Sequence, residues 1–304
     1  MKDHFYRDFE LLFRGDRSEI RERLRVYLPL VQPLLELYPD AVAMDLGCGR
    51  GEWLETLRDQ GFKVSGVDLD EGMLEDCQAL QLEVRNEDAL SALRSLENES
   101  TSLVSAFHLV EHIAFDDLRS LVEEAHRVLK PGGLLIMETP NPENLTMAAS
   151  RFYLDPTHTR PIPPGLLSFI PRYYGFSKSI VFRLQESPAL RSNPSPTLLD
   201  VLEGVSPDYA VIAQKSASDD VLDRFKPAFA QDMGLTIETL TARYDQMMRG
   251  EVAAQRERIQ SLESRLNDVL NSTSWKLTCP LRMLGKGLSR LKKLFLRQPP
   301  PAQE

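Results

Sequence analysis

The sequence contains few cysteines and no long apolar run. Cys48, Cys77 and Cys279 are odd in number and widely spaced, which argues against a disulfide framework and against a zinc cluster built on cysteine. No stretch approaches the roughly 18 consecutive apolar residues of a membrane-spanning helix, and the opening residues MKDHFYRDFE lack the apolar segment of a signal peptide. We therefore expect a cytoplasmic protein without a bound metal.

Acidic residues outnumber basic ones over most of the chain, and the reverse holds near its end. The 304 residues have a net charge of −9. From Ser272 onward, seven lysines and arginines stand against the single acid Glu304, so residues 272–304 carry +6 and the preceding residues −15. Because an acidic body repels nucleic acid, no nucleic-acid partner is expected, and the basic tail needs a separate explanation.

Short apolar, β-branched runs alternate with helical patterns between residue 41 and about residue 215. Strands are expected at residues 41–47, 63–70, 82–88, 103–112, 134–140, 179–186 and 208–215, with helices such as 71–79 and 116–129 between the earlier ones. Alternation of this kind predicts parallel strands joined by crossover helices. The expected fold is therefore a doubly wound α/β sheet, formed by residues 41–217.

Three further segments surround the predicted sheet. Residues 1–40 predict a helical segment, with a helix that begins at the N-cap Ser18 and ends before Pro33. Residues 145–178 form a long insertion rich in proline and aromatic residues, and insertions at such a place usually shape a substrate pocket. Residues 218–271 predict a helical segment with a short coiled coil, because Val252, Ile259 and Leu266 fall seven residues apart. A single solvated helix that packs on the domain is the alternative.

Residues 272–304 predict a basic amphipathic helix. The apolar positions step by three or four residues through Leu281, Leu284, Leu288, Leu291 and Phe295, with lysine and arginine on the other face. Such a helix suits an anionic membrane interface, which favours peripheral contact with the cytoplasmic face of the inner membrane. Docking onto the acidic body or onto a partner helix is the alternative.

Glycines and acids follow the first three predicted strands. Residues 45–51, DLGCGRG, close the first strand and open a helix, where glycines let the backbone approach a ligand and leave amide groups free for it. The spacing G-x-G-x-G differs from the dinucleotide fingerprint G-x-G-x-x-G, which argues against an NAD-dependent oxidoreductase. Asp68 ends the second strand, where a carboxylate can accept ribose hydroxyls, and Asp88 ends the third. The plain alternative is a structural turn with two capping acids.

Residues 43–143 resemble the class I S-adenosyl-L-methionine (SAM) dependent methyltransferases. The motifs are AMDLGCGRGEWL, VSGVDLDEGML, NEDAL, AFHLVEH and LKPGGLLIMETPNP, in that order. The resemblance implies SAM as cofactor and a seven-stranded sheet whose last strand, residues 208–215, is antiparallel. It also implies a set of cofactor-binding residues: Asp45, Gly47 and Gly49 with the two glycines near the methionine portion, Asp68 and Leu69 at the ribose, Asp88 and Ala89 at the adenine, and His108 near the sulfonium.

A narrower resemblance extends beyond this core. FYRDFELLFRGDRSEIRERLRVYLPLV and FYLDPTHTRPIPPGLLSFIPRYYGF resemble the methyltransferase portion of bacterial O-antigen chain-terminating enzymes, and NSTSWKLTCPLR resembles a segment of polysaccharide-assembly proteins and glycosyltransferases. The resemblance implies that Tyr6, Arg7 and Arg25 form a lid over the cofactor. It further implies methylation of a surface polysaccharide or its lipid-linked precursor. Because the sequence has no kinase signature, a terminal phosphate acceptor would need a separate kinase, and a sugar hydroxyl is the other acceptor.

Four residues are candidates for catalysis or acceptor binding. Glu111 and His112 follow the fourth strand, and His158 and Arg160 lie in the insertion. A base with an orienting cation suits a hydroxyl acceptor, whereas a phosphate oxygen needs only cations; a helix cap or a loop hydrogen bond is the plain alternative for each residue. The function expected is therefore a polysaccharide O-methyltransferase that can form homo-oligomers and can work with a glycosyltransferase or kinase. A non-catalytic SAM-binding adaptor and a small-molecule methyltransferase are the alternatives.

Overall fold

The computed structural model describes residues 15–231 and 234–285. The chain forms two units, Met1–Tyr244 and Asp245–Glu304, which are described separately below. The division falls well after the boundary expected at residue 217. The residues that follow the sheet add the helices α12 (Asp219–Asp223) and α13 (Lys226–Phe229). Phe225, the N-cap of α13, and Ala228 within α13 are buried in the core of the first unit.

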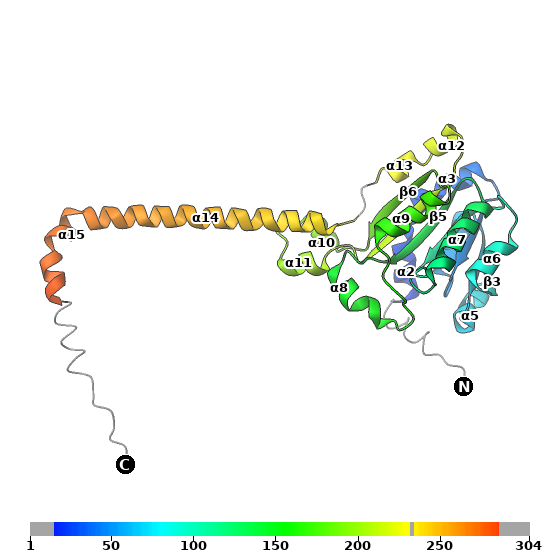
Figure 1. The fold of residues 1–304 in the computed structure, drawn as a ribbon, viewed down its shortest axis with the longest axis horizontal. Helices are drawn as coiled ribbons and strands as arrows, with labels where there is room; N and C mark the ends of the chain where they lie inside the picture. The colour runs from blue at the N-terminus through cyan, green and yellow to red at the C-terminus, as the bar shows by residue number, and fades with distance from the viewer. Residues whose placement is uncertain (1–14, 232–233, 286–304) are drawn as a thin grey trace, which may run out of the picture. The chain divides into compact units, whose positions relative to one another are not determined.

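The first unit is built on one seven-stranded sheet with helices on both faces (Figure 1). The strands are β1 (Val42–Leu46), β2 (Lys63–Asp68), β3 (Glu83–Asn86), β4 (Thr101–Phe107), β5 (Leu129–Pro140), β6 (Lys178–Leu184) and β7 (Asp208–Gln214). Their order is β3-β2-β1-β4-β5-β7-β6, and β7 pairs antiparallel with both β5 and β6. This confirms the expected doubly wound sheet and its antiparallel last strand.

Apolar side chains on both faces of the central strands form the core, as covered parallel strands require. One face packs against α6 (Ala89–Ser95), α7 (Phe115–Val128) and α9 (Pro164–Tyr173), and the other packs against α3 (Leu28–Leu37), α4 (Glu52–Gln60) and α13. The helix α5 (Glu71–Ala79) covers a smaller apolar cluster around Cys77. The remaining short helices of this unit are α8 (Leu145–Ala149), η2 (Arg151–Leu154), α10 (Pro188–Arg191) and α11 (Leu198–Glu203).

The N-terminal helical segment differs from expectation in two ways. The helix α2 (Arg17–Leu24) is capped by Asp16, whose carboxylate accepts from the Glu19 amide at 3.0 Å, so Ser18 is not the N-cap. A short 3-10 turn, η1 (Arg25–Tyr27), leads into α3, and Pro33 lies inside α3 rather than beyond the helix. A proline there removes one backbone hydrogen bond, and burial of Leu30 and Leu34 on the sheet offsets that loss.

The described part of the second unit is helical except at the breaks around Ser272 and Thr278. The helix α14 (Ile237–Asn271) begins in the first unit and continues into the second, and α15 (Thr273–Leu277) follows. Val252, Ile259 and Leu266 are 44%, 54% and 57% exposed, so the predicted heptad positions lie on the surface of this chain. Across residues 15–231 and 234–285, none of the helices combines the length and the apolarity needed to cross a bilayer.

Candidate active site

The loop between β1 and α4 has one packed face and one open face. Gly47, Gly49 and Gly51 all have a positive φ, which favours glycine. A Cβ at Gly51 would lie 2.8 Å from the Sγ of Cys77, whereas a Cβ at Gly49 would meet no atom within 4 Å. The backbone at Gly49 is therefore open to a ligand, while Gly51 is required for packing.

Asp68 joins this loop to the end of β2. Its carboxylate accepts from the amides of Gly49 and Asp70, both at 2.8 Å, and Asn86 donates to the backbone carbonyls of Asp68 and Leu69. The side chain of Leu69 is 72% exposed, a high value for leucine. The structure therefore holds the carboxylate of Asp68 beside the open face of the glycine loop, with an apolar side chain next to it.

Asp88 has a second role as a helix cap. It is the N-cap of α6 and accepts from the Ser91 amide at 2.9 Å, and the hydrogen bonds from Ser91 hold its pKa below the usual value. Ala89 is the first residue of α6. Both residues follow β3 as expected, but the cap accounts for the carboxylate without a ligand, so their contact with a cofactor stays a prediction.

A cavity of about 230 Å³ opens where β1 and β4 end and β7 begins. It contains the predicted residues Asp45, Gly47, Gly49 and His108. Asp68, Leu69, Asp88 and Ala89 are not part of its lining. The other residues that line it are Ile20, Arg23, Leu24, Cys48, Arg50, Glu52, Trp53, Phe107, Glu138, Gln185 and Asp208.

Buried carboxylates give this cavity an acidic floor. Glu138 accepts hydrogen bonds from the Tyr27 hydroxyl and from Gln185 Nε2 (3.1 Å), and its Oε1 lies 3.4 Å from His108 Nε2. Burial raises the pKa of Asp208 to about 7, against the opposing attraction of His108. Burial likewise raises the pKa of Asp45 to about 7, although a hydrogen bond from Ser105 works against the rise.

His108 connects the cavity to the fourth strand's end. Its backbone has φ +51, a conformation that is uncommon outside glycine and concentrates at functional sites. Its Nδ1 lies 3.2 Å from Glu111 Oε1, while its Nε2 faces Glu138. Glu111 is completely buried, which raises its pKa, but the hydrogen bond and charge of His108 outweigh burial and leave the pKa below its usual value.

The insertion brings one more of the predicted residues, His158, to this place. Thr159 donates its amide and its hydroxyl to the Glu111 carbonyl oxygen at 2.9 and 2.8 Å. The imidazole rings of His112 and His158 lie 4.6 Å apart. The structure thus gathers Glu111, His112 and His158 from segments more than forty residues apart. Arg160 instead stacks over the Phe115 ring at 4.7 Å and does not join them.

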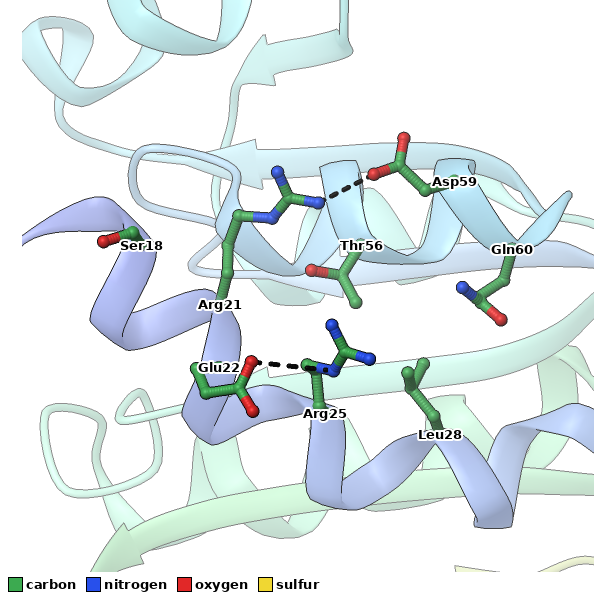
Figure 2. A pocket seen from close by; sticks show the side chains of 8 residues that line it. All are labelled: Ser18, Arg21, Glu22, Arg25, Leu28, Thr56, Asp59 and Gln60. Atoms are coloured by element: carbon green, nitrogen blue, oxygen red, sulfur yellow. Dashed lines mark hydrogen bonds and ion pairs between the residues drawn. The ribbon is translucent and has the colours of Figure 1, made fainter.

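The predicted lid arginine lies elsewhere. Arg25 is absent from the cavity lining; it pairs with Glu22 at 3.6 Å and faces a separate pocket between α2 and α4 (Figure 2). Arg23 lines the cavity instead. Residues two positions apart, such as Arg23 and Arg25, point about 200° apart around a helix axis and so lie on nearly opposite faces. Contact of Arg25 with the cofactor therefore stays a prediction to which this cavity adds no support, and Tyr6 and Arg7 lie outside the described residues.

Sequence reasoning missed several cavity residues, of which Glu138 and Asp208 are the most informative. Glu138 is the one acid inside the apolar run LLIMETP, and Asp208 opens a strand that is buried throughout. A carboxylate in a buried strand is costly unless it is paired or used, and that signal could have identified both. Tyr27 and Trp53 looked like ordinary core residues in the sequence, and only the fold places them beside the cavity.

Comparisons with known proteins identify the family. Residues 44–137 match the family described as Methyltransferase domain. The crystal structure of a SAM-dependent methyltransferase from Archaeoglobus fulgidus is 31% identical, with a TM-score of 0.62, and the match covers 69% of this chain and 100% of that one. This chain belongs to the SAM-dependent methyltransferases.

Curated relatives agree at the level of the family. A probable SAM-dependent methyltransferase of Mycolicibacterium smegmatis is 31% identical over 134 residues, covering 44% of this methyltransferase and 51% of that protein. A ubiquinone biosynthesis O-methyltransferase of Leptothrix cholodnii is 31% identical over 113 residues, covering 34% and 47%. The chain therefore spans about half the length of the curated relatives it matches.

The residues of the cavity fit SAM, which supplies an electrophilic methyl group on a sulfonium when it is bound. The indole Nε1 of Trp53 is buried without a hydrogen-bond partner among the described residues, and together with Arg23 it offers donors for the amino-acid carboxylate. Asp68 would accept from ribose hydroxyls. The carboxylate of Glu138, and those of Asp45 and Asp208 when ionised, would favour a cationic ligand. Buried walls that align donor and acceptor can lower a barrier by roughly 7–11 kcal/mol.

Proposed function

We propose that this methyltransferase transfers a methyl group to an oxygen atom at the end of a bacterial surface polysaccharide or its lipid-linked precursor. The acceptor oxygen belongs to a sugar hydroxyl or to a terminal phosphate. One observation carries the proposal: the insertion that resembles chain-terminating enzymes is fastened by Thr159 to Glu111, beside the histidine that lines the cofactor cavity. The insertion that carries the resemblance therefore borders the cofactor cavity, next to which the acceptor would bind.

The same wall presents aromatic surface to an incoming acceptor. Tyr153 is 60% exposed, and its ring packs on Phe152, whose ring lies 4.5 Å from that of His158. Exposed aromatic rings combine an apolar face with a polar edge, as a sugar ligand needs. A sugar hydroxyl also needs a base, typically worth about 10²–10⁴-fold in rate, and His108 between Glu111 and Glu138 is placed for it.

The second unit supports a location at a membrane or a membrane-bound assembly. Leu281 and Leu284 are 70% and 67% exposed, and Arg282 lies over the Trp275 ring at 3.7 Å. Apolar side chains with adjacent cations suit an anionic interface. Leu288, Leu291 and Phe295, which complete the predicted amphipathic helix, lie outside the described residues. The exposed heptad positions of α14 support self-association or pairing with a glycosyltransferase or kinase.

A small-molecule acceptor is the second candidate. The relative from Leptothrix cholodnii is named for ubiquinone biosynthesis, and the apolar side chains of Leu145 and Leu154 are 44% and 53% exposed in the insertion. These side chains suit an apolar phenol as well as a lipid-linked glycan. A SAM-binding adaptor without turnover is the third reading, and only the measurement of methyl transfer separates it from the others.

The test is transfer of labelled methyl from SAM into fractions of a membrane extract from a bacterium that carries this protein. We expect label in the lipid-linked glycan with the wild type and with Asp117→Ala, an exposed control on α7, and none with Asp68→Ala. Phosphatase treatment of the acceptor distinguishes phosphate from hydroxyl. Label in the free quinone and phenol fraction would replace the proposal with the second candidate. Cofactor binding without label in any fraction, with or without an added kinase, would leave the adaptor.

A further inference from the structure

Three potential ligand atoms converge outside the cofactor cavity. The side chains of Glu111, His112 and His158 each offer one, and all three atoms lie within 4.8 Å of one another. His158 Nε2 is 4.0 Å from Glu111 Oε1 and 3.9 Å from Asp155 Oδ2. The chemistry proposed above uses His108, which contacts Glu111, and assigns no role to His112 or His158.

Hydrogen bonds fix the tautomers of both histidines. His158 Nδ1 lies 2.6 Å from the Phe152 carbonyl oxygen, which can only accept, so Nδ1 carries the proton. The Thr157 hydroxyl donates to Asp155 at 2.6 Å and therefore accepts from His112 Nδ1 at 2.8 Å. In the neutral imidazoles, each Nε2 then presents a lone pair.

This arrangement matches the surroundings of metal-binding histidines, in which the second ring nitrogen donates to a carbonyl, a carboxylate or a water. His158 has the carbonyl directly, and His112 reaches the carboxylate of Asp155 through Thr157. Glu111 Oε2 accepts from the Thr139 hydroxyl at 2.9 Å, which orients the carboxylate. All three side chains are thus held by neighbours.

The three ligand atoms could bind one ion if they moved slightly closer together. Atoms 4.8 Å apart at the corners of a triangle lie about 2.8 Å from its centre, and zinc binds nitrogen and oxygen ligands at about 2.0–2.2 Å. Each ligand atom would move by less than about 1 Å. His108, Glu138 and Asp208 form a second group within the same limit, but both ring nitrogens of His108 face carboxylates, so that group is paired internally.

We propose that Glu111, His112 and His158 bind a divalent transition-metal ion, for which zinc is the reference. Two imidazoles and one carboxylate favour zinc over magnesium, which prefers oxygen ligands. Three protein ligands leave a position open for an acceptor oxygen, and Glu111 also contacts His108 at the cavity. The expectation of no metal considered only cysteine spacing, which does not test this set. Binding of the ion itself does not depend on the proposed acceptor.

The test measures metal binding by the full chain without SAM or acceptor. After treatment with a chelator, the wild type is titrated with Zn²⁺ by calorimetry, its metal content is measured by mass spectrometry, and Co²⁺ is added to record the visible spectrum. We expect one equivalent of Zn²⁺, weakened at least 10-fold in His158→Ala and Glu111→Gln. Thr157→Val, which removes the hydrogen bonds of the Thr157 hydroxyl with His112 and Asp155, should weaken binding about 10-fold or more.

The matched control is His126→Ala, because His126 packs against Phe176 away from the cluster; it should bind Zn²⁺ like the wild type. Circular dichroism identifies any variant that fails to fold, and His158→Gln then replaces it. Failure of the folded wild type to bind one equivalent of Zn²⁺ overturns the proposal. An equal loss of Zn²⁺ affinity in His126→Ala and His158→Ala also overturns the proposal, because that result would mean that scattered surface groups bind the ion. Neither result bears on the polysaccharide acceptor, which the labelling experiment tests.

Discussion

The hydroxyl of Tyr27 donates a hydrogen bond to the carboxylate of Glu138, although the two residues are 111 positions apart in the sequence. Tyr27 is fully buried at the end of η1, and Glu138 lies near the end of β5. The proximity of that carboxylate, added to burial, holds the pKa of Tyr27 well above its usual value. The bond therefore attaches the N-terminal helices to the floor of the cofactor cavity.

Replacement of Tyr27 by phenylalanine should destabilise the protein by about 1–3 kcal/mol, because a buried carboxylate loses a partner. Urea denaturation measures this loss. Tyr38→Phe is the matched control, since the Tyr38 hydroxyl donates to the Pro131 carbonyl oxygen at an exposed site; its loss should stay below about 1 kcal/mol. Equal effects of the two changes would show that the bond to Glu138 has no special importance.

Asp68→Ala should weaken SAM binding at least 10-fold. The change removes the carboxylate that lies against the Gly49 amide, and hydrogen bonds to a charged group are worth about 1.5–3 kcal/mol each. Calorimetric titration with SAM measures the affinity. Asp88→Ala should mainly remove a helix cap, at about 1 kcal/mol of stability, so a loss of affinity as large as that of Asp68→Ala would show that Asp88 contacts the cofactor.

Asp45 should make stability fall as the pH rises. Its pKa is about 7 in the folded protein and 3.8 in its ordinary state, so between those values the folded chain holds a proton that the unfolded chain has released. The free energy of unfolding should therefore fall by roughly 4 kcal/mol from this group between pH 4 and pH 8. Asp45→Asn should flatten the slope by that amount, whereas Asp117→Asn should leave it unchanged. Denaturation curves across this range measure both.

The heptad positions of α14 should mediate self-association. Ile259→Glu places a charge in the apolar stripe and should convert an oligomer to a monomer in analytical ultracentrifugation. Gln260→Glu adds the same charge next to it, on another face of the helix, and should preserve the oligomer. A wild-type chain that sediments as a monomer at all concentrations would leave the stripe to a different partner.

The tail should bind anionic vesicles. Leu281→Glu combined with Leu284→Glu replaces two exposed apolar side chains and should reduce cosedimentation with phosphatidylglycerol vesicles by more than 10-fold, since burial of each side chain is worth about 1.5–3 kcal/mol. Glu263→Gln in α14 is the control and should bind as the wild type does. Equal binding by the double variant and the wild type would contradict a membrane role.

The sheet could be predicted from the sequence because its signals are local. Glycines, strand-end acids and apolar runs lie within a few residues of one another. Every expected strand was found, although β4 ends five residues before its predicted end and β5 begins five residues before its predicted start. The arginine that lines the cavity could not be predicted in this way. Arg23 and Arg25 are the same residue type, and the structure distinguishes them by the face of the helical segment on which each lies. That face depends on where the helix begins.

The grouping of site residues was predictable only in part. Glu111 and His112 follow a strand and were singled out for that reason, but their approach to His158 depends on the path of the insertion and on Thr159. Tyr27 and Gln185 reach Glu138 from distant elements. No single-sequence pattern encodes such contacts, because they arise from packing between segments that are far apart along the chain.

The position of β7 also bears on how the protein is made. Because β7 lies between β5 and β6, β6 cannot join the sheet until the ribosome has released residues 208–214, whereas β5 can already pair with β4 along its other edge. Until then, β5 exposes an apolar edge and β6 has no neighbour to pair with. Such unpaired edges invite association between nascent chains. Synthesis of the last strand is therefore the step that closes the sheet and ends the period of greatest risk of aggregation.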